Sequence, residues 1–167
     1  MATPWRMRRG AATIAVLLCW SSVALADGYC NVSSTGIAFG NYDPLNPTPT
    51  AVLGTVLATC THTGGGASNF VITTTLSPGN SGSHPDRWML RAGGTEQLLY
   101  NIFVDAGFAQ VFGNGAGGTV TGPTTQIRVS NGKSTVENVG TLYGRIPAGQ
   151  IVTPGSYSDT VVVTINY

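Results

Sequence analysis

The residues that could do chemistry are few, and their spacing does not build a cofactor site. The run Gly-Asn-Gly-Ala-Gly-Gly at 113–118 has the G-x-G-x-x-G spacing of a dinucleotide-binding loop. Such a loop must lie between a strand and a helix, and Thr-Val-Thr-Gly-Pro at 119–123 cannot begin a helix. We therefore interpret the run as a flexible turn and expect no bound cofactor.

Metal ligands and catalytic groups are equally sparse. Cys60 and His62 are two residues apart and His84 is distant, whereas a zinc site needs three or four suitably spaced ligands. The sequence contains no G-x-S-x-G nucleophile elbow. Six carboxylates could in principle supply the pair for glycoside hydrolysis, although no motif groups them: Asp43, Asp86, Glu96, Asp105, Glu137 and Asp159. We expect no metal, no catalytic residue and no enzymatic activity, and a small secreted hydrolase is the weakest of the alternatives.

The first 26 residues predict a secretory signal peptide. Three arginines at 6–9 precede a short apolar run that ends on Ala-Leu-Ala at 24–26. The run is short for a transmembrane helix, and no second hydrophobic span follows it. We expect cleavage after Ala26 and a mature domain of residues 27–167.

Cleavage would change the charge and leave two cysteines. Three of the eight basic residues would leave and all seven acidic residues would stay, for a net charge of −2. Without a basic stripe, nucleic acid is an unsuitable partner. Cys30 and Cys60 in an exported chain predict a disulfide, which would close a loop of about 30 residues and contribute about 3–4 kcal/mol. Two free thiols are the alternative.

Short alternating runs between Gly, Pro and Asn clusters predict one all-β domain. We expect strands at 52–61, 70–76, 98–104, 127–129, 139–146 and 157–167, and a hairpin strand at 108–112. Asn-Gly at 131–132 is a hairpin signal. Seven or eight short strands in about 140 residues are typical of an immunoglobulin-like β-sandwich.

The last eleven residues form the clearest strand. Val161, Val163, Ile165 and Tyr167 recur every second residue, mostly with polar residues between them, so one face of the strand is apolar. Burying each of these side chains is worth about 1.5–3 kcal/mol. We therefore expect this strand to lie inside a sheet, with a neighbour on each side.

Five segments of the mature chain form a recognisable set: Cys-Asn-Val-Ser at 30–33, Phe-Gly-Asn-Tyr-Asp-Pro at 39–44, Tyr-Asn-Ile-Phe-Val-Asp at 100–105, Tyr-Gly-Arg-Ile-Pro-Ala-Gly-Gln at 143–150 and Gly-Ser-Tyr-Ser-Asp-Thr-Val at 155–161. Together they resemble the spore coat protein U domain family, which includes subunits of archaic, Csu-type chaperone–usher pili. The resemblance extends over essentially the whole mature chain. Tyr-Gly-Arg-Ile-Pro together with Gly-x-Tyr-x-Asp-x-Val is its most specific part.

The resemblance implies an incomplete sandwich that lacks its final strand. A periplasmic chaperone would lend a strand to the open groove, and at the outer-membrane usher the N-terminal extension of the next pilin subunit would replace it. The walls would come from the last strand and from two residues on the first strand: Val161, Val163, Ile165 and Tyr167, facing Ile37 and Phe39. Ordinary core packing is the alternative for all six.

The implied function is that of a non-enzymatic structural subunit of a bacterial surface fimbria, serving adhesion and biofilm formation. Such a subunit is exported through the inner membrane to the periplasm and then reaches the cell surface, and it has no small-molecule substrate. After the expected cleavage only three residues precede Cys30, which span about 10 Å as a strand. We therefore expect the subunit to accept a strand but hardly to donate one, and to be tip-proximal. The alternative is a self-complete secreted protein, either a lectin-like adhesin or a spore-coat structural protein.

The segment at 105–115 departs from the family pattern. Family members often carry a basic residue near position 108, Trp near 112 and Asp near 114, whereas this chain has Phe108, Phe112 and Asn114. An exposed aromatic loop formed by Phe108 and Phe112 could contact hydrophobic surfaces. A buried hairpin is the interpretation we prefer.

Overall fold

The computed structural model describes residues 28–167, so the expected signal peptide at 1–26 lies outside the described residues. Within them the chain forms ten β-strands and one short 3₁₀ turn, η1. In chain order these are β1 Gly28–Ser34, β2 Thr50–His62, β3 Ala67–Leu76, η1 Gly79–Ser81, β4 Trp88–Arg91, β5 Gln97–Leu99, β6 Asn101–Phe103, β7 Thr125–Ser130, β8 Lys133–Ile146, β9 Tyr157–Ser158 and β10 Val163–Asn166.

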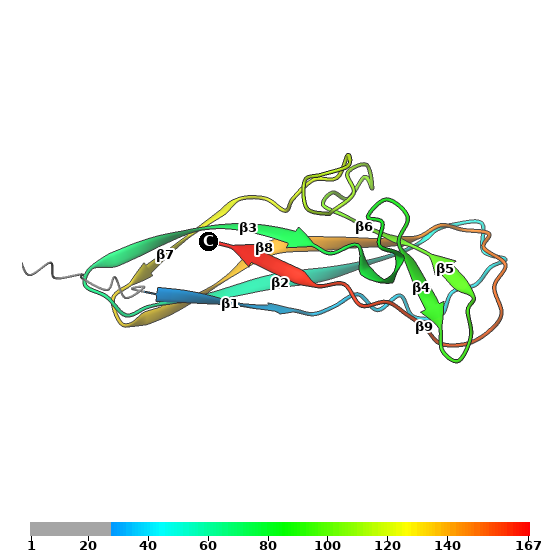
Figure 1. Cartoon of the computed structure of the whole chain (residues 1–167), viewed down its shortest axis with the longest axis horizontal. Helices are drawn as coiled ribbons and strands as arrows, with labels where there is room; N and C mark the ends of the chain where they lie inside the picture. The colour runs from blue at the N-terminus through cyan, green and yellow to red at the C-terminus, as the bar shows by residue number, and fades with distance from the viewer. Residues whose placement is uncertain (1–27) are drawn as a thin grey trace, which may run out of the picture.

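The strands form three antiparallel sheets, with the orders β1-β2-β8-β6, β10-β3-β7 and β5-β4-β9. The longest pairing joins β2 to β8, from Thr50 opposite Ile146 to His62 opposite Lys133. Figure 1 shows an elongated molecule whose long strands follow its long axis, with β4, β5 and β9 at the end opposite the start of β1. The predicted all-β, immunoglobulin-like architecture is confirmed.

The core lies between the sheets and takes every second residue of each long strand. On β2, for example, Val56, Ala58 and Cys60 are fully buried, whereas Leu53 on the other face is 67% exposed. The core also takes residues from the other strands and their connections: Ile72, Leu76, Met89, Leu98, Tyr100, Ile102, Phe112, Ile127, Val129, Val139, Leu142 and Ile146. The strands predicted at 52–61, 70–76, 127–129 and 139–146 are confirmed as parts of β2, β3, β7 and β8.

The strand predicted at 98–104 is wrong, because the chain changes sheets at Tyr100. β5 pairs with β4, and β6 pairs with β8 in a different sheet. The Tyr100 N–H donates to the carbonyl of Arg87 (3.0 Å), and its hydroxyl donates to Asp159 (2.7 Å). These two contacts from distant parts of the chain divide one alternating run into two strands. The strand predicted at 157–167 is likewise divided, into β9 and β10, and strand β4 was not predicted.

The hairpin predicted around Asn131 and Gly132 is also only partly right. A turn does occur there, with Gly132 at φ +65°, where glycine is favoured. The strands that it joins pair with different neighbours, however: β7 with β3, and β8 with β2. The turn therefore connects the two layers of the sandwich and does not close a paired hairpin.

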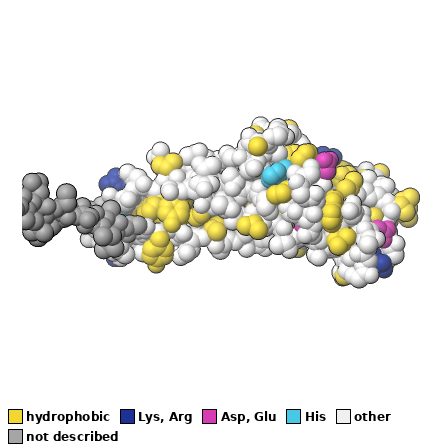
Figure 2. All heavy atoms as spheres, in the orientation of Figure 1, with side chains coloured by type: hydrophobic (Ala, Val, Ile, Leu, Met, Phe, Trp, Pro, Cys, Tyr) yellow, Lys and Arg dark blue, Asp and Glu magenta, His cyan; other side chains and the backbone are white. Residues whose placement is uncertain are grey.

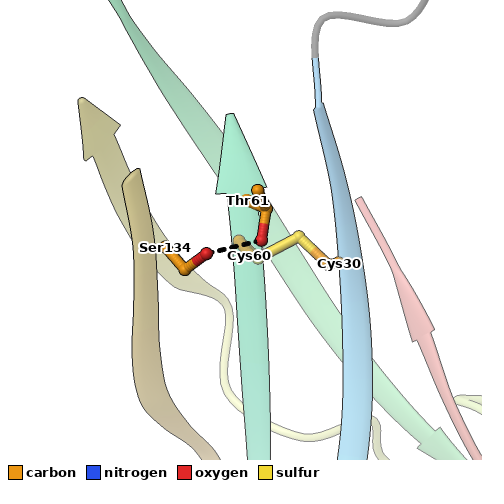
Figure 3. Close-up of a disulfide and its surroundings, with 4 residues drawn as sticks. All are labelled: Cys30, Cys60, Thr61 and Ser134. Carbon is orange, nitrogen blue, oxygen red and sulfur yellow. Dashed lines mark hydrogen bonds between the residues drawn. A yellow bond between two sulfur atoms is a disulfide. The ribbon is translucent and has the colours of Figure 1, made fainter. Parts of the chain in front are cut away.

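A disulfide joins the first two strands and confirms the predicted pairing of Cys30 with Cys60. The two cysteines are directly opposite each other in the β1–β2 ladder. Figure 3 shows the bridge beside Thr61, whose hydroxyl is 2.7 Å from that of Ser134 on β8. Because β1 is an edge strand with β2 as its one neighbour in the sheet, the disulfide fastens an edge of that sheet.

Candidate functional site

Two sheet edges face each other without pairing. β1 is the edge of one sheet and β10 is the edge of another, and Cα atoms of the two strands come within 8 Å of each other. In Figure 1, β10 (red) lies beside β3 and runs close to β1. Within the described residues β10 has one neighbour, β3, so the neighbour expected on its other side stays a prediction.

The free edge of β10 carries unpaired backbone groups. The Ser77 N–H donates to the carbonyl of Val162 (2.9 Å), which places the backbone groups of Val162 on the β3 side. Because these groups alternate along an antiparallel strand, the N–H and C=O groups of Val163 and Ile165 point away from β3. Their side chains, unlike the exposed Val162, are half-buried. The edge therefore offers hydrogen bonds and apolar side chains at the same residues.

The opposite wall is an extended segment that follows β1. The last backbone hydrogen bond between the β1 side and β2 is from the Thr35 N–H to the Thr55 carbonyl (3.1 Å). Residues 36–42, which follow, have no strand assignment. Gly36 has φ +69°, a conformation that turns the chain out of the ladder. Ile37 and Phe39 belong to this segment, so their predicted place on the first strand is wrong.

Ile37 and Phe39 nevertheless point into the sandwich and lie against Gly144 of β8. A Cβ atom at Gly144 would come 2.8 Å from Ile37 Cγ2 and 3.0 Å from Phe39 Cζ. Similarly, a Cβ atom at Gly54 of β2 would collide with the carbonyl oxygen of Gly36. These two glycines create the space through which the segment crosses the inner face of the sheet.

A cavity of about 360 Å³ lies between the two walls. Ile37 and Phe39 line one side, Val161 and Val163 line the other, and its lining also includes Leu76, Met89, Ile102 and Leu142. A second hollow of about 570 Å³ shares Ile37, Phe39, Met89 and Tyr157 and continues between residues 37–44 and 152–157. In Figure 2 charged side chains on the visible face lie mainly toward its two ends. The arrangement is an apolar groove flanked by backbone groups.

The other two predicted groove residues lie farther along β10. Ile165 is half-buried, and Tyr167 is 58% exposed. The Tyr167 ring packs edge-on against Phe70 with 6.0 Å between ring centroids. Phe70 in turn reaches β1, because a Cβ atom at Gly28 would lie 2.7 Å from Phe70 Cζ. At this end of β10, aromatic rings bridge the gap that is open beside Val161.

Val32 is an inward-facing residue of β1 that the sequence analysis missed. It pairs with Ala58, which is fully buried, yet Val32 is 38% exposed. Both side chains therefore face the interior, and Val32 is exposed because the space beside β1 is not filled. Its position two residues after Cys30 on the same face was a signal that could have identified it.

Between β9 and β10, the side chain of Asp159 is held by three hydrogen bonds, and we call this group the polar anchor. Asp159 Oδ2 accepts from the Tyr100 hydroxyl (2.7 Å), and Oδ1 accepts from the N–H groups of Asn80 (2.8 Å) and Thr160 (2.7 Å). Burial raises the pKa of Tyr100, and the hydrogen bond to Asp159 raises that pKa further. Both Tyr100 and Asp159 line the 360 Å³ cavity.

Beneath this anchor lies Arg87, a fully buried cation. Its guanidinium donates to the carbonyls of Ser77 (2.8 Å) and Phe112 (2.9 Å) and to Asn101 Oδ1 (2.8 Å). Burial lowers the pKa of Arg87, whereas the nearby Tyr100 and Asp159 oppose this shift. Because these bonds join three separate segments of the chain, Arg87 fixes the connections that support the cavity.

The alternative of an exposed aromatic contact surface is wrong for Phe112, which is fully buried in the core, as the preferred interpretation has it. Phe108 is half-buried, with its ring 5.5 Å from that of Phe103 and 5.3 Å from Arg145 Cζ. The predicted hairpin strand at 108–112 is also wrong, because only isolated bridges form there. The loop turns at Phe108 (φ +54°) and folds back against β6 and β8.

Two other sheet edges are covered, in contrast to that of β10. The Gln150 side chain donates to Leu99 O (2.9 Å) and accepts from Leu99 N–H (2.8 Å), so its amide replaces a neighbouring strand at β5. At β6, the Phe112 N–H donates to Ile102 O (2.9 Å). Proteins commonly cover their sheet edges, because open edges bind other chains. The facing edges of β10 and β1 lack a covering strand within the described residues, so this part of the fold can bind another chain.

We expect Gly144→Val to deform the groove from the inside. The new side chain would displace Ile37 and Phe39, and overpacking of this kind typically costs about 1–3 kcal/mol. Gly140→Ala is the matched control, because its Cβ atom would lie 3.7 Å from the nearest atom of Val56, an ordinary contact. Urea unfolding should show a loss for Gly144→Val and less than about 1 kcal/mol for Gly140→Ala. Equal stability of the two variants would contradict this packing.

Residues 28–167 contain no group of three or more His, Cys, Asp or Glu side chains that could hold a metal ion. In the same part of the chain no helix has the length and apolar character needed to cross a membrane. A family model described as the Spore Coat Protein U domain matches residues 15–164. No curated protein matches the chain.

Proposed function

The chain belongs to the Spore Coat Protein U domain family, and on this premise we propose that it is a structural subunit of a bacterial surface fimbria whose groove accepts a β-strand from another protein. The observation that carries the proposal is the apolar cavity between Ile37 and Phe39 on one wall and Val161 and Val163 on the other. It lies beside a strand edge with unpaired backbone groups. An inserted strand would satisfy both features at once.

The inserted strand would continue the sheet from β10. Its backbone would pair with Val163 and Ile165, and alternate side chains would fill the cavity, each contributing about 1.5–3 kcal/mol. A periplasmic chaperone would supply this strand first, and a neighbouring pilin subunit would replace it at the outer-membrane usher. Before insertion the open edge would favour aggregation, which gives the chaperone its role.

We further propose that the domain at 27–167 is exported to the periplasm by the segment at 1–26 and then reaches the cell surface, where the fibre serves adhesion and biofilm formation. β1 begins at Gly28 and is already paired with β2. With cleavage after Ala26, these residues would not be free for donation. This supports a tip-proximal position for the subunit.

The proposal predicts that an added strand stabilises the chain. A short turn and an alternating-valine strand of about ten residues, appended after Tyr167, would run back along the free edge of β10. We expect the tail to raise the midpoint of thermal unfolding by about 10 °C or more, since 1 kcal/mol corresponds to about 2–4 °C in a domain of this size.

The control tail has serine at each inward-facing position and the same length. It should leave the unfolding midpoint unchanged, and the unextended chain should aggregate more readily than the valine-tailed one in size-exclusion chromatography. If the unextended chain is instead a robust monomer and neither tail changes its unfolding, the sandwich is self-complete and the proposed function is wrong.

A further inference from the structure

The cavity lining contains one charged side chain. Of the described residues that line the 360 Å³ cavity, Asp159 alone carries a formal charge. It lies at the break between β9 and β10, on the wall that an inserted strand would follow. The neighbouring inward positions on this wall are the apolar Val161 and Val163. A strand in the groove would therefore pass one charged side chain, Asp159, among apolar side chains.

The carboxylate of Asp159 is held in one orientation. Three hydrogen bonds fix it, from Tyr100 to Oδ2 and from Asn80 and Thr160 to Oδ1. On its other side is Gly79 (φ +74°), where even a Cβ atom would collide with the carboxylate. Asp159 cannot rotate away from an inserted strand without breaking these contacts.

One acceptor position of the carboxylate remains available. Each carboxylate oxygen has two lone pairs; Oδ1 accepts two hydrogen bonds, whereas Oδ2 accepts the one from Tyr100. An aliphatic side chain placed against Oδ2 would remove water from a charged group without replacing the hydrogen bond, which is unfavourable. A hydroxyl group of serine or threonine would donate to Oδ2.

We propose that Asp159 sets the register of the inserted strand by requiring a hydroxyl-bearing residue at the position that faces it. The partner is an extended segment with apolar residues at its other inward positions and serine or threonine at this one. The inference rests on the proposed function, because it concerns the strand that the groove accepts. Asp159 acts here as a specificity determinant, and the valines beside it supply the apolar contacts.

The test uses the full chain with the valine tail, because the turn fixes the register of the appended strand. A series of tails replaces the valine at each inward position in turn by threonine. Threonine is nearly the same size as valine, so the series changes polarity at constant shape. We expect threonine to lower the unfolding midpoint at every position except the one facing Asp159, where it should raise the midpoint above that of the all-valine tail.

Two variants identify Asp159 as the cause. In Asp159→Asn the threonine preference should shrink or disappear at that position, whereas in Thr160→Ala, which alters an exposed neighbour outside the cavity lining, it should persist. Loss of stability at every threonine position, or an unchanged preference in Asp159→Asn, would overturn the inference while leaving strand insertion intact. If no tail in the series stabilises the chain, the proposed function itself fails.

Discussion

Val163→Asp is expected to abolish strand insertion, whereas Val162→Asp should leave it intact. Val163 lines the cavity and its backbone groups face the free edge of β10, whereas its neighbour Val162 is 57% exposed on the outer face. An inserted strand would cover a carboxylate at position 163 and deprive it of water, and an unpaired buried charge is strongly unfavourable. We expect strand binding to weaken at least about a hundredfold, which corresponds to about 2.8 kcal/mol.

The measurement is the binding of a labelled alternating-valine peptide to each purified variant, followed by fluorescence anisotropy. The two substitutions add the same charge to adjacent residues of one strand, so a general effect of charge would change both variants equally. Circular dichroism should show the same β-sheet spectrum for both. Normal peptide binding by Val163→Asp would place the docking site elsewhere on the molecule.

Alternation in the sequence predicted the strands whose environment is uniform along their length. β2, β7 and the second halves of β3 and β8 alternate between buried and more exposed residues, so the period-two pattern identified them. The first part of β8, residues 133–138, has no buried residue and was not predicted. The position of Val163 facing the interior followed from the same pattern. The cysteines were paired from their number and compartment alone, and the disulfide confirms that pairing.

The features that escaped the sequence analysis depend on contacts between distant residues. Tyr100 ends one strand because its hydroxyl meets Asp159, 59 residues away in the chain. Phe112 was expected in a paired hairpin strand, but it packs against Gly122, where a Cβ atom would come 2.9 Å from Phe112 Cζ. Asp159 was grouped with ordinary carboxylates, because nothing local to it reveals a partner at Asn80 or Tyr100. A period-two pattern shows which residues share a face of a strand, but it does not reveal contacts between residues that are far apart in the chain.

For the groove residues too, the sequence indicated which residues are apolar but did not indicate how distant segments place them. Ile37 and Phe39 were predicted as groove residues on the first strand, and in the structure they line the cavity together with Val161 and Val163. They do so from an unpaired segment, however, and reach the cavity because Gly54 and Gly144 leave space on β2 and β8. A small residue on one strand therefore determines where a large residue from another segment can lie.

Removal of the disulfide is expected to have the largest effect on stability. The double variant Cys30→Ala with Cys60→Ala opens a loop of 30 residues, for which the chain-entropy account gives a loss of about 3–4 kcal/mol. The structural consequence should centre on β1, since this edge strand is paired with β2 alone in its sheet. Ser34, the residue of β1 that lines the cavity, lies four residues from the lost bridge. The loss should therefore affect the groove wall as well as the global stability.

The experiment compares urea unfolding of the valine-tailed chain with and without the two cysteines. Thr61→Ala is a suitable control, because it removes the hydroxyl contact with Ser134 beside the disulfide (Figure 3), and exposed hydroxyl contacts of this kind usually change stability by less than about 0.5 kcal/mol. The double variant should also gain less from the tail than the native chain does, because β1 supports one side of the inserted strand's cavity. An unchanged tail effect in a destabilised double variant would show that the bridge stabilises the sandwich without shaping the groove, and an unchanged unfolding curve would contradict both roles.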